Sequence, residues 1–364
     1  MNAIILSEPG KLAPHDAPEP ATPRVGEALI RVHRIGFCGT DYHAFHGRQP
    51  FFDYPHILGH ELGVEVLGVG AGVSNVTVGD KCSIEPYLNC GSCHACRKGR
   101  TNCCSSMKVL GVHVDGGMRD RLVVPAAKLH VSKTLSYDAL ALVETLAIGA
   151  HAIDRAAVEK DETVVVIGAG PIGLAAVQFA LLRGARVMVI DRAAPRLEAC
   201  SRLYPGAITL DPEKSFVEQL TSITSGDLAD TVIDATGNLA SMGGSLEYVG
   251  HTGSLVYVGL AQGEVTFNDP LFHRREMTLF ASRNALSKDF PEIISAMEQG
   301  KIDPLAWITH RCTLAEIPEK LPLWSEPKAG VIKAVASGSP PDSTEPDATD
   351  LLKDHQFNAP TCPS

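Results

Sequence analysis

The sequence of 364 residues lacks three features that would place the protein on a membrane or a nucleic acid. It has 32 basic and 42 acidic residues, so there is no excess positive charge to attract phosphate backbones or anionic lipids. No stretch is apolar for long enough to span a bilayer. The chain has no basic start and reaches Glu8 and Pro9 too early for a signal peptide. We therefore expect a cytoplasmic protein that binds small molecules, not nucleic acid or membrane.

The length favours two domains of about 100 to 200 residues each. From Glu27 to about Val124, short apolar runs broken by Gly, Pro and Asp predict a β-rich segment with long loops. From Thr163 onward, strand and helix patterns alternate, which predicts a parallel sheet covered by helices. The expected elements are strands at 163–167, 186–190, 231–233 and 254–258, and helices from about Pro171 and Ala194.

The last part of the chain contains a helix pattern near 290–298 and a strand pattern at 331–335. We expect both to return to the first domain. Residues 337–364 are rich in Ser, Pro and Asp and have too little apolar content to form a core. They are predicted to form a loose tail.

A glycine-rich turn follows the first strand of the predicted parallel sheet. It has the GxGxxG pattern between a strand and a helical run, which is the setting that dinucleotide binding requires. The first glycine permits a tight turn, the second lets a pyrophosphate approach the backbone, and the third lets the helix pack on the strand. The helix N-terminus then holds the phosphates. The predicted cofactor-binding residues are Gly168, Gly170, Pro171, Ile172 and Gly173.

Asp191 ends the next predicted strand, eighteen residues after Gly173. A carboxylate at this position accepts hydrogen bonds from ribose hydroxyls and repels a 2′-phosphate, so NAD is predicted rather than NADP. Arg192 and Arg196 leave NADP as the alternative, because a guanidinium could bind the 2′-phosphate. Arg196 is included among the expected cofactor-binding residues.

Most of the ten cysteines lie between positions 82 and 104. Cys90, Cys93 and Cys96 are three residues apart, and Cys103 and Cys104 follow. Four thiolates on such short loops can close a tetrahedral shell around one structural zinc ion, and an iron-sulfur cluster is the alternative. The spacing leaves open which of the last two cysteines is the fourth ligand.

Two other segments supply the ligand types of a catalytic zinc site. Cys38 and the pair His60-Glu61 provide a thiolate, an imidazole and a carboxylate, which leaves one position for substrate. Zinc is a Lewis acid towards an alcohol, whose hydride can pass to a nicotinamide. Alone, His60 would more often be a structural histidine and Cys38 a buried thiol, so the prediction depends on their arrangement.

These motifs, in this order, resemble the zinc-containing medium-chain dehydrogenase/reductase family of alcohol dehydrogenases over about residues 1–335. The resemblance implies an α/β fold with a β-rich GroES-like catalytic domain at 1–146 plus 283–336. It also implies a Rossmann domain with a doubly wound parallel sheet at 147–282. Members are usually dimers or tetramers, so a homodimer or homotetramer is expected.

The resemblance also implies roles for single residues. Cys38 and His60 would bind the catalytic zinc, and Glu61 would be an adjacent or transient ligand. Asp41 would orient His60, as residues behind a metal ligand do. Thr40 and His43 would relay the alcohol proton to solvent. In the four-cysteine site, the resemblance selects Cys104 as the fourth ligand.

Glu144 stands at the third protein position of the catalytic zinc. By resemblance, a glutamate here is typical of the sorbitol and threonine branches, whereas simple alcohol dehydrogenases have cysteine. We predict that Glu144 is both a zinc ligand and a catalytic residue, and that the substrate is polyol-like. Thr145 and Val64 depart from the branch, which usually has proline and glycine there.

Segments 47–52, 99–104, 272–276 and 282–285 resemble the L-galactonate dehydrogenase branch. The predicted reaction passes a hydride from a secondary hydroxyl of a sugar acid or polyol to NAD, giving a ketone. Arginine binds a carboxylate through two parallel hydrogen bonds, which favours a sugar acid. The candidate substrate-binding residues are His46, Arg48, Arg275, Arg283 and Asn284.

Three other functions are alternatives to this one. By resemblance, L-threonine 3-dehydrogenase and sorbitol dehydrogenase share the zinc ligands and Glu144. A non-catalytic nucleotide-binding protein of the crystallin type is disfavoured, because Cys38, Thr40, His43 and His60 are all present.

Overall fold

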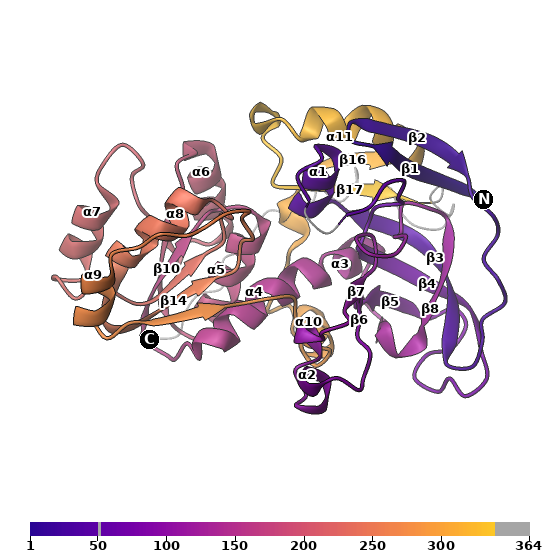
Figure 1. The fold of residues 1–364 in the computed structure, drawn as a ribbon, viewed down its shortest axis with the longest axis horizontal. Helices are drawn as coiled ribbons and strands as arrows, with labels where there is room; N and C mark the ends of the chain where they lie inside the picture. The colour runs from indigo at the N-terminus through magenta and orange to yellow at the C-terminus, as the bar shows by residue number, and fades with distance from the viewer. Residues whose placement is uncertain (50–51, 339–364) are drawn as a thin grey trace.

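The computed structural model describes residues 1–49 and 52–338, and Figure 1 shows its ribbon. Residues 50 and 51 of the segment 47–52 lie outside the described residues, as do residues 339–364 of the expected loose tail. Two large sheets organise the described chain and lie towards opposite ends of the longest axis (Figure 1). Within the described ranges, no helix is both long and apolar enough to cross a membrane.

One sheet has six strands, and every pairing in it is parallel. Its order is β12-β11-β10-β13-β14-β15, so the chain reverses direction across the sheet beside β10, and ligands bind at such a switch point. The predicted Rossmann sheet is confirmed. The strands are β10 (Thr163–Ile167), β11 (Arg186–Ile190), β12 (Ile208–Thr209), β13 (Ala229–Asp234), β14 (Val249–Tyr257) and β15 (Thr278–Ala281). The helices between them are α5 (Pro171–Leu182), α6 (Ala194–Leu203), α7 (Phe216–Ile223), α8 (Leu239–Gly244) and α9 (Asp269–Arg274).

The central strands of this sheet are apolar on both faces. Val164, Val165 and Val166 are consecutive and completely buried in β10. A parallel strand covered by helices on both sides buries successive side chains, which therefore need not alternate with polar ones. The burial of these strands fixes the position of the glycine loop that follows β10.

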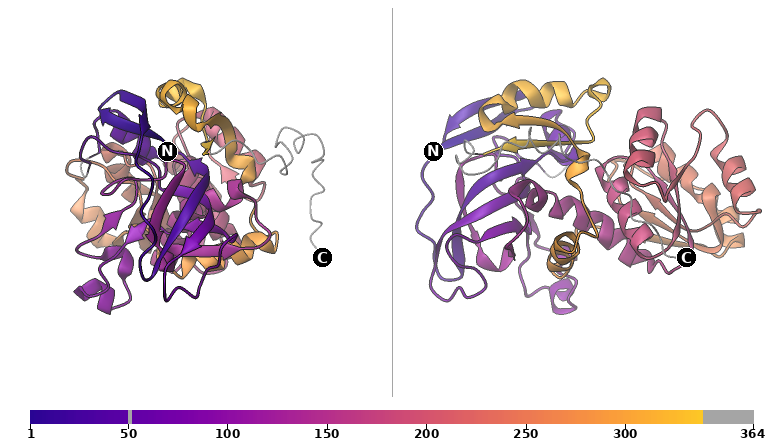
Figure 2. Two further views of the ribbon diagram at one scale, coloured as in Figure 1. Left: turned by 90° about the vertical axis from the view of Figure 1, so that its right-hand side faces the viewer. Right: turned by 180° about the vertical axis from the view of Figure 1, so that it is seen from behind.

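The other sheet has seven strands and is mostly antiparallel. Its order is β16-β17-β3-β4-β5-β9, with β8 paired to β3, so strands from both ends of the described chain lie side by side. The strands are β3 (Glu27–Gly36), β4 (Glu61–Val69), β5 (Lys81–Ile84), β8 (Arg121–Pro125), β9 (Leu129–Ser132), β16 (Ile308–Thr313) and β17 (Lys333–Ser337). Smaller elements around it are β1 (Asn2–Glu8), β2 (Lys11–Asp16), β6 (Tyr87–Leu88), β7 (Lys108–Val109), α1 (Gly39–Phe45), α2 (His94–Arg97), η1 (Thr101–Cys103), α3 (Tyr137–Ala141) and α11 (Ile317–Trp324). The β1-β2 hairpin lies against α11 (Figure 2).

Two helices lie between the sheets, α4 (Val143–Ala156) and α10 (Asp289–Glu298) (Figures 1 and 2). A Cβ atom at Gly149 of α4 would lie 2.4 Å from the Cβ atom of Ala175 in α5, so this glycine lets the two helices touch. The expected boundary between residues 146 and 147 falls inside α4. The division of the chain into two domains stays a prediction.

Candidate active site

The pairing of β3 with β4 brings the first catalytic residues together. Gly36 at the end of β3 lies opposite Glu61 at the start of β4. Cys38 follows Gly36 by two residues and His60 precedes Glu61 by one, so this register places them next to each other. A Cβ atom at Gly36 would lie 2.3 Å from Glu61 Oε2, so only glycine leaves room for the carboxylate.

Asp41 fixes the turn that carries Cys38. The backbone N–H of Cys38 donates to Asp41 Oδ2 at 2.9 Å, and α1 begins directly after Cys38. The completely buried Asp41 carboxylate also directs its Oδ1 at His60 Nδ1, 3.9 Å away. This position suits the predicted role of Asp41 in orienting His60.

Cys38, His60 and Glu61 form a group that fits a metal ion. One ligand atom from each lies within 4.8 Å of the others, which is compatible with zinc bonds of about 2.0 to 2.3 Å. Burial alone would lower the pKa of His60, but the Asp41 carboxylate and Cys38 raise that pKa well above its ordinary value. The negative groups therefore favour a positive charge at this place, and a zinc ion would supply it.

Glu144 reaches the same region from the N-terminal turn of α4. Its buried carboxylate accepts a hydrogen bond from the hydroxyl of buried Tyr87. Burial raises the pKa of Glu144, His60 lowers it and Glu61 raises it, so the three groups interact electrostatically. Among the described residues, the group within 4.8 Å contains Glu61 and not Glu144. Zinc ligation by Glu144 stays a prediction.

A buried lysine and threonine hold Glu61, and our sequence-based site did not include them. Lys333 in β17, 1% exposed, forms an ion pair with Glu61 Oε2 and donates to Thr145 Oγ1 at 2.9 Å. Thr145 in turn donates to Glu61 Oε1 at 2.8 Å. A buried carboxylate is stable only when its charge is paired and its oxygens are hydrogen-bonded. The sequence did contain one signal for this buried pair, because Lys333 interrupts the apolar run 331–336.

Thr40 and His43 lie on α1, directly after Cys38. Thr40 is half-buried, and His43 is exposed to solvent. Partial burial and the nearby charges of Arg48 and His46 lower the pKa of His43. The two residues thus lie on one short helix between the metal group and solvent, and the proton relay stays a prediction.

The four-cysteine site is complete in the structure. One sulfur from each of Cys90, Cys93, Cys96 and Cys104 lies within 4.8 Å of the others, whereas Cys103 is exposed and outside this group. Backbone N–H groups donate to the sulfurs, for example Cys90 to Cys104 Sγ at 3.3 Å. Hydrogen bonds from the backbone of Cys96 and Ser105 lower the pKa of Cys93 to about 5. Burial and the neighbouring sulfurs raise the pKa of Cys96 to about 11, so a bound zinc ion would be needed to hold all four cysteines as thiolates.

We expect two zinc ions per chain in the fully loaded protein, one at each group. Cys93→Ser should lose the zinc ion of the four-cysteine site and keep the catalytic one, because the two groups share no ligand. Cys103→Ser is the matched control and should keep both. Metal analysis of the purified variants measures this. Two zinc ions in Cys93→Ser, or one in Cys103→Ser, would contradict the assignment.

The glycine loop after β10 has the shape that a pyrophosphate needs. Gly168 has φ +98°, and a Cβ atom at Gly173 would lie 1.7 Å from the Gly168 carbonyl oxygen, so neither position accepts a side chain. A Cβ atom at Gly170 would meet only the Arg196 guanidinium, 4.0 Å away. Pro171 begins α5, and Ile172 continues its first turn. The backbone at Gly170 is therefore accessible to a pyrophosphate, whereas Gly168 and Gly173 pack against each other. Dinucleotide binding requires both features.

Asp191 lies beside this loop, after β11. Its Oδ2 accepts from the backbone N–H of Ala169 at 2.8 Å, and its Oδ1 accepts from that of Ala193 at 2.8 Å. Arg196 Nη1 lies 3.9 Å from Asp191 Oδ2. The carboxylate thus faces the glycine loop with a guanidinium next to it, and Asp191 lies at the carboxyl edge of the sheet, directly after the strand beside β10.

Two candidate substrate residues are used elsewhere. The Arg275 guanidinium donates to the main-chain carbonyls of Leu246, Glu247 and Val249, so it fixes the backbone of the parallel sheet. The side-chain amide of Asn284 donates to the carbonyl of Asn102 at 3.3 Å. Sequence position alone could not reveal these partners, because the fold creates them.

His46, Arg48 and Arg283 are exposed, and His46 Nε2 lies within hydrogen-bond distance of Ser325 Oγ, at 3.1 Å. His46 and Arg48 follow α1, and Arg48 acts electrostatically on His43. The carbonyl of Arg48 accepts from Gln262 Nε2 at 3.2 Å, which links this loop to the parallel-sheet side. The Arg283 charge acts on His113. Their roles towards substrate stay predictions.

Two parts of the chain match families of known proteins. Residues 24–134 match the alcohol dehydrogenase GroES-like domain, and residues 171–299 match the zinc-binding dehydrogenase family. The predicted GroES-like and Rossmann combination is thus confirmed. The chain is 42% identical over 324 residues to L-galactonate-5-dehydrogenase of Escherichia coli strain K12, covering 88% of this chain and 95% of that protein.

Solved structures agree with this fold. An alcohol dehydrogenase from Escherichia coli CFT073 complexed with NADH is 28% identical, with a TM-score of 0.86, covering 93% of this chain and 99% of the other. A zinc-binding dehydrogenase from Sinorhizobium meliloti 1021 bound to NADP is also 28% identical, with a TM-score of 0.85, covering 92% of this chain and 98% of the other. Similar folds therefore bind either dinucleotide, so the choice between them must come from local residues.

Proposed function

Because the chain belongs to the zinc-binding alcohol dehydrogenase family, we propose that it oxidises a secondary hydroxyl of a sugar acid or polyol to a ketone and reduces NAD. The enzyme class follows from family membership, and zinc and NAD are the cofactors. The substrate class is supported by the 42% identity to L-galactonate-5-dehydrogenase. The observation that carries the chemistry is the group of half-buried Cys38 with buried His60 and Glu61.

In this proposal some side chains of the site bind the metal, and others transfer the proton of the substrate hydroxyl to solvent. Cys38 and His60 bind zinc together with Glu144 or Glu61, and zinc supplies Lewis acidity towards the substrate hydroxyl. Thr40 accepts the substrate's hydroxyl proton while it releases its own, and His43 passes a proton on to solvent. The direction of this path follows the increase in exposure from Thr40 to His43.

The surroundings of the site favour a polar substrate. Glu144 lies near His60, and its carboxylate can accept a hydrogen bond from a substrate hydroxyl in addition to the one from Tyr87. Arg48, beside His43, can pair with the carboxylate of a sugar acid, because a planar guanidinium matches a carboxylate with two hydrogen bonds. An apolar alcohol would gain neither the hydrogen bond to Glu144 nor the pairing with Arg48. We also expect a homodimer or homotetramer.

A substrate panel tests the proposed function. We expect NADH formation to be most efficient with L-galactonate or a related hexonate, lower with sorbitol, and lowest with ethanol. The measurement is kcat/KM from absorbance of NADH, with threonine included. Ethanol as the best substrate, or no reaction with any polyhydroxylated compound, would reject the substrate class. Threonine as the best substrate would indicate L-threonine 3-dehydrogenase.

Asp191→Ala should relax the preference for NAD over NADP by about tenfold or more, because the carboxylate that repels a 2′-phosphate is removed while Arg196 stays. The measurement is the ratio of kcat/KM for the two dinucleotides. As a control, Arg196→Met in the Asp191→Ala background should lower the use of NADP again. A native enzyme that uses NADP better than NAD would contradict the assignment.

A further inference from the structure

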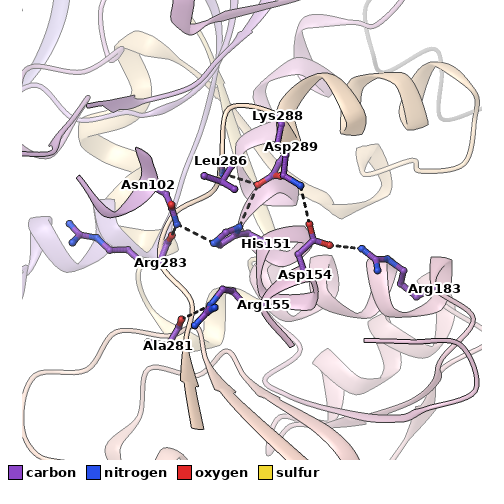
Figure 3. Close-up of polar contacts among 10 residues, drawn as sticks. All are labelled: Asn102, His151, Asp154, Arg155, Arg183, Ala281, Arg283, Leu286, Lys288 and Asp289. Carbon is purple, nitrogen blue, oxygen red and sulfur yellow. Dashed lines mark hydrogen bonds and ion pairs between the residues drawn. The ribbon is translucent and has the colours of Figure 1, made fainter. Parts of the chain in front are cut away.

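The segment 282–288 crosses from the parallel sheet to the other part of the molecule. It leaves the carboxyl end of β15, the edge at which parallel sheets bind their ligands, and it ends at α10. Figure 3 shows how this segment lies along α4. Its placement therefore bears on both the dinucleotide edge and the helix that carries Glu144.

The segment 90–104 carries the four cysteines and is called the lobe below. Its residue Asn102 contacts the crossover segment 282–288 directly. Its amide Nδ2 donates to the main-chain oxygen of Arg283 at 2.9 Å and lies 3.1 Å from His151 Nε2 (Figure 3). Its own main-chain oxygen accepts from Asn284 Nδ2 at 3.3 Å. One residue of the lobe thus binds two successive crossover residues and one residue of α4.

The chemistry of these partners fixes the direction of each hydrogen bond. A carbonyl oxygen only accepts, so the amide nitrogen of Asn102 must face Arg283. His151 Nε2 then accepts from the same nitrogen, and the ring proton is on Nδ1. Nδ1 lies 3.6 Å from Asp289 Oδ2, which is longer than a hydrogen bond, and this oxygen accepts from the backbone N–H of Leu286 at 2.8 Å. The network therefore runs from the lobe through α4 to the start of α10.

The members of this network are buried, and the position of Asn102 depends on the lobe. Asn102, His151 and Asp289 are between 2% and 3% exposed. If a substitution removed one of their hydrogen bonds, water could not replace it. Asn102 is in η1, two residues before Cys104, the buried member of the cysteine group. The lobe has only short helical turns of its own, and such segments depend on a bound metal for their structure.

Other contacts hold the crossover without involving the lobe. Lys288 Nζ lies 3.8 Å from Asp154 Oδ2, and Arg155 Nε donates to the Ala281 carbonyl at 3.3 Å (Figure 3). Lys288 is exposed, and exposed ion pairs contribute little to stability. It therefore offers a matched control on the same segment.

We propose that Asn102 is a positioning residue that couples the four-cysteine site to the crossover 282–288, so that closure of the lobe around its metal sets the affinity for the dinucleotide. The coupling goes beyond the hydride transfer proposed above. It rests on that proposal only in taking NADH as the bound dinucleotide.

The test compares zinc-loaded full-length variants by NADH binding, measured from nucleotide fluorescence, and by hydrogen exchange of peptides covering 281–289. Asn102→Leu should keep two zinc ions, weaken NADH binding about five- to tenfold and speed exchange in the crossover. Asn284→Gly should give a smaller change of the same sign, since glycine accepts the φ of +51° at this position. Lys288→Ala should differ from the native protein by less than about twofold.

A double-mutant cycle with Cys93→Ser identifies the coupling. Cys93→Ser should weaken NADH binding in the native background and have little further effect in Asn102→Leu, because the link is already broken. The proposal would be overturned if Cys93→Ser weakened NADH binding equally in the native and Asn102→Leu backgrounds. It would also be overturned if Asn102→Leu lost zinc, or if it bound NADH as tightly as Lys288→Ala does. If Asn102→Leu does not fold, the cycle is made with Asn284→Gly under the same criteria. A native protein that binds no NADH would instead reject the proposed function.

Discussion

Glu144→Ala should lower kcat by about a hundredfold or more while NADH binding and the fold are retained. The carboxylate lies in a buried site beside His60 and Glu61, where a charge acts strongly on a metal and on a reacting hydroxyl. The alanine variant leaves the Tyr87 hydroxyl without its acceptor, at a cost of about 1 to 3 kcal/mol in stability, which a stable domain tolerates.

Two further variants distinguish charge from shape at this position. Glu144→Gln keeps the volume and an acceptor for Tyr87 but removes the negative charge. Because we attribute the role to this charge, the kcat of Glu144→Gln should fall nearly as far as that of Glu144→Ala. Tyr87→Phe keeps the charge and removes the hydroxyl, so its effect on kcat should be smaller. Steady-state kinetics and zinc content are measured for all three. Turnover of Glu144→Ala equal to that of the native enzyme would refute the role.

Lys333→Met should destabilise the protein by about 3 to 5 kcal/mol, since it leaves the buried Glu61 carboxylate without its cation. Thr145 would also lose the ammonium donor of its hydroxyl oxygen. Urea unfolding followed by circular dichroism measures the free energy of unfolding. Lys328→Met, at an exposed lysine near β17, is the control and should change stability by less than about 0.5 kcal/mol.

A second substitution tests the cause of this loss. Glu61→Gln added to Lys333→Met removes both charges, so the double variant should recover part of the stability. Lys333→Met that is no less stable than Lys328→Met would show that the buried pair is not needed. A double variant less stable than either single one would also contradict the explanation.

The parallel sheet was predictable because its signals are local. Residues 163–167 and 186–190 are strands with the predicted bounds, since uninterrupted apolar runs end at turn residues in both. The helix α4 gave no such signal. Its first residues, 143–147, are all buried and include the polar Glu144 and Thr145, so polar positions do not mark an exposed face in this part of the helix. The short edge strand β15 also lacked a pattern, because three of its four residues are exposed.

The site was predictable only where motif residues carry the chemistry. Cys38 and His60 come together through the pairing of β3 with β4, whereas the family resemblance supplied only their shared role as zinc ligands. The hydrogen bond of Lys333 to Thr145 joins residues 188 positions apart, and that of Tyr87 to Glu144 joins residues 57 apart. Such long-range partners depend on the assembled fold, and no local spacing indicates them.

Transfer of deuterium from a labelled substrate tests the central claim most directly. L-galactonate deuterated at the carbon that is oxidised is incubated with NAD and the zinc-loaded enzyme, and with enzyme freed of zinc by a chelator. The proposed function predicts one deuterium in the NADH formed, a ketone as product, and loss of the reaction without zinc that is reversed when zinc is restored. NADH that carries no deuterium, or full turnover by the zinc-free enzyme, would contradict it.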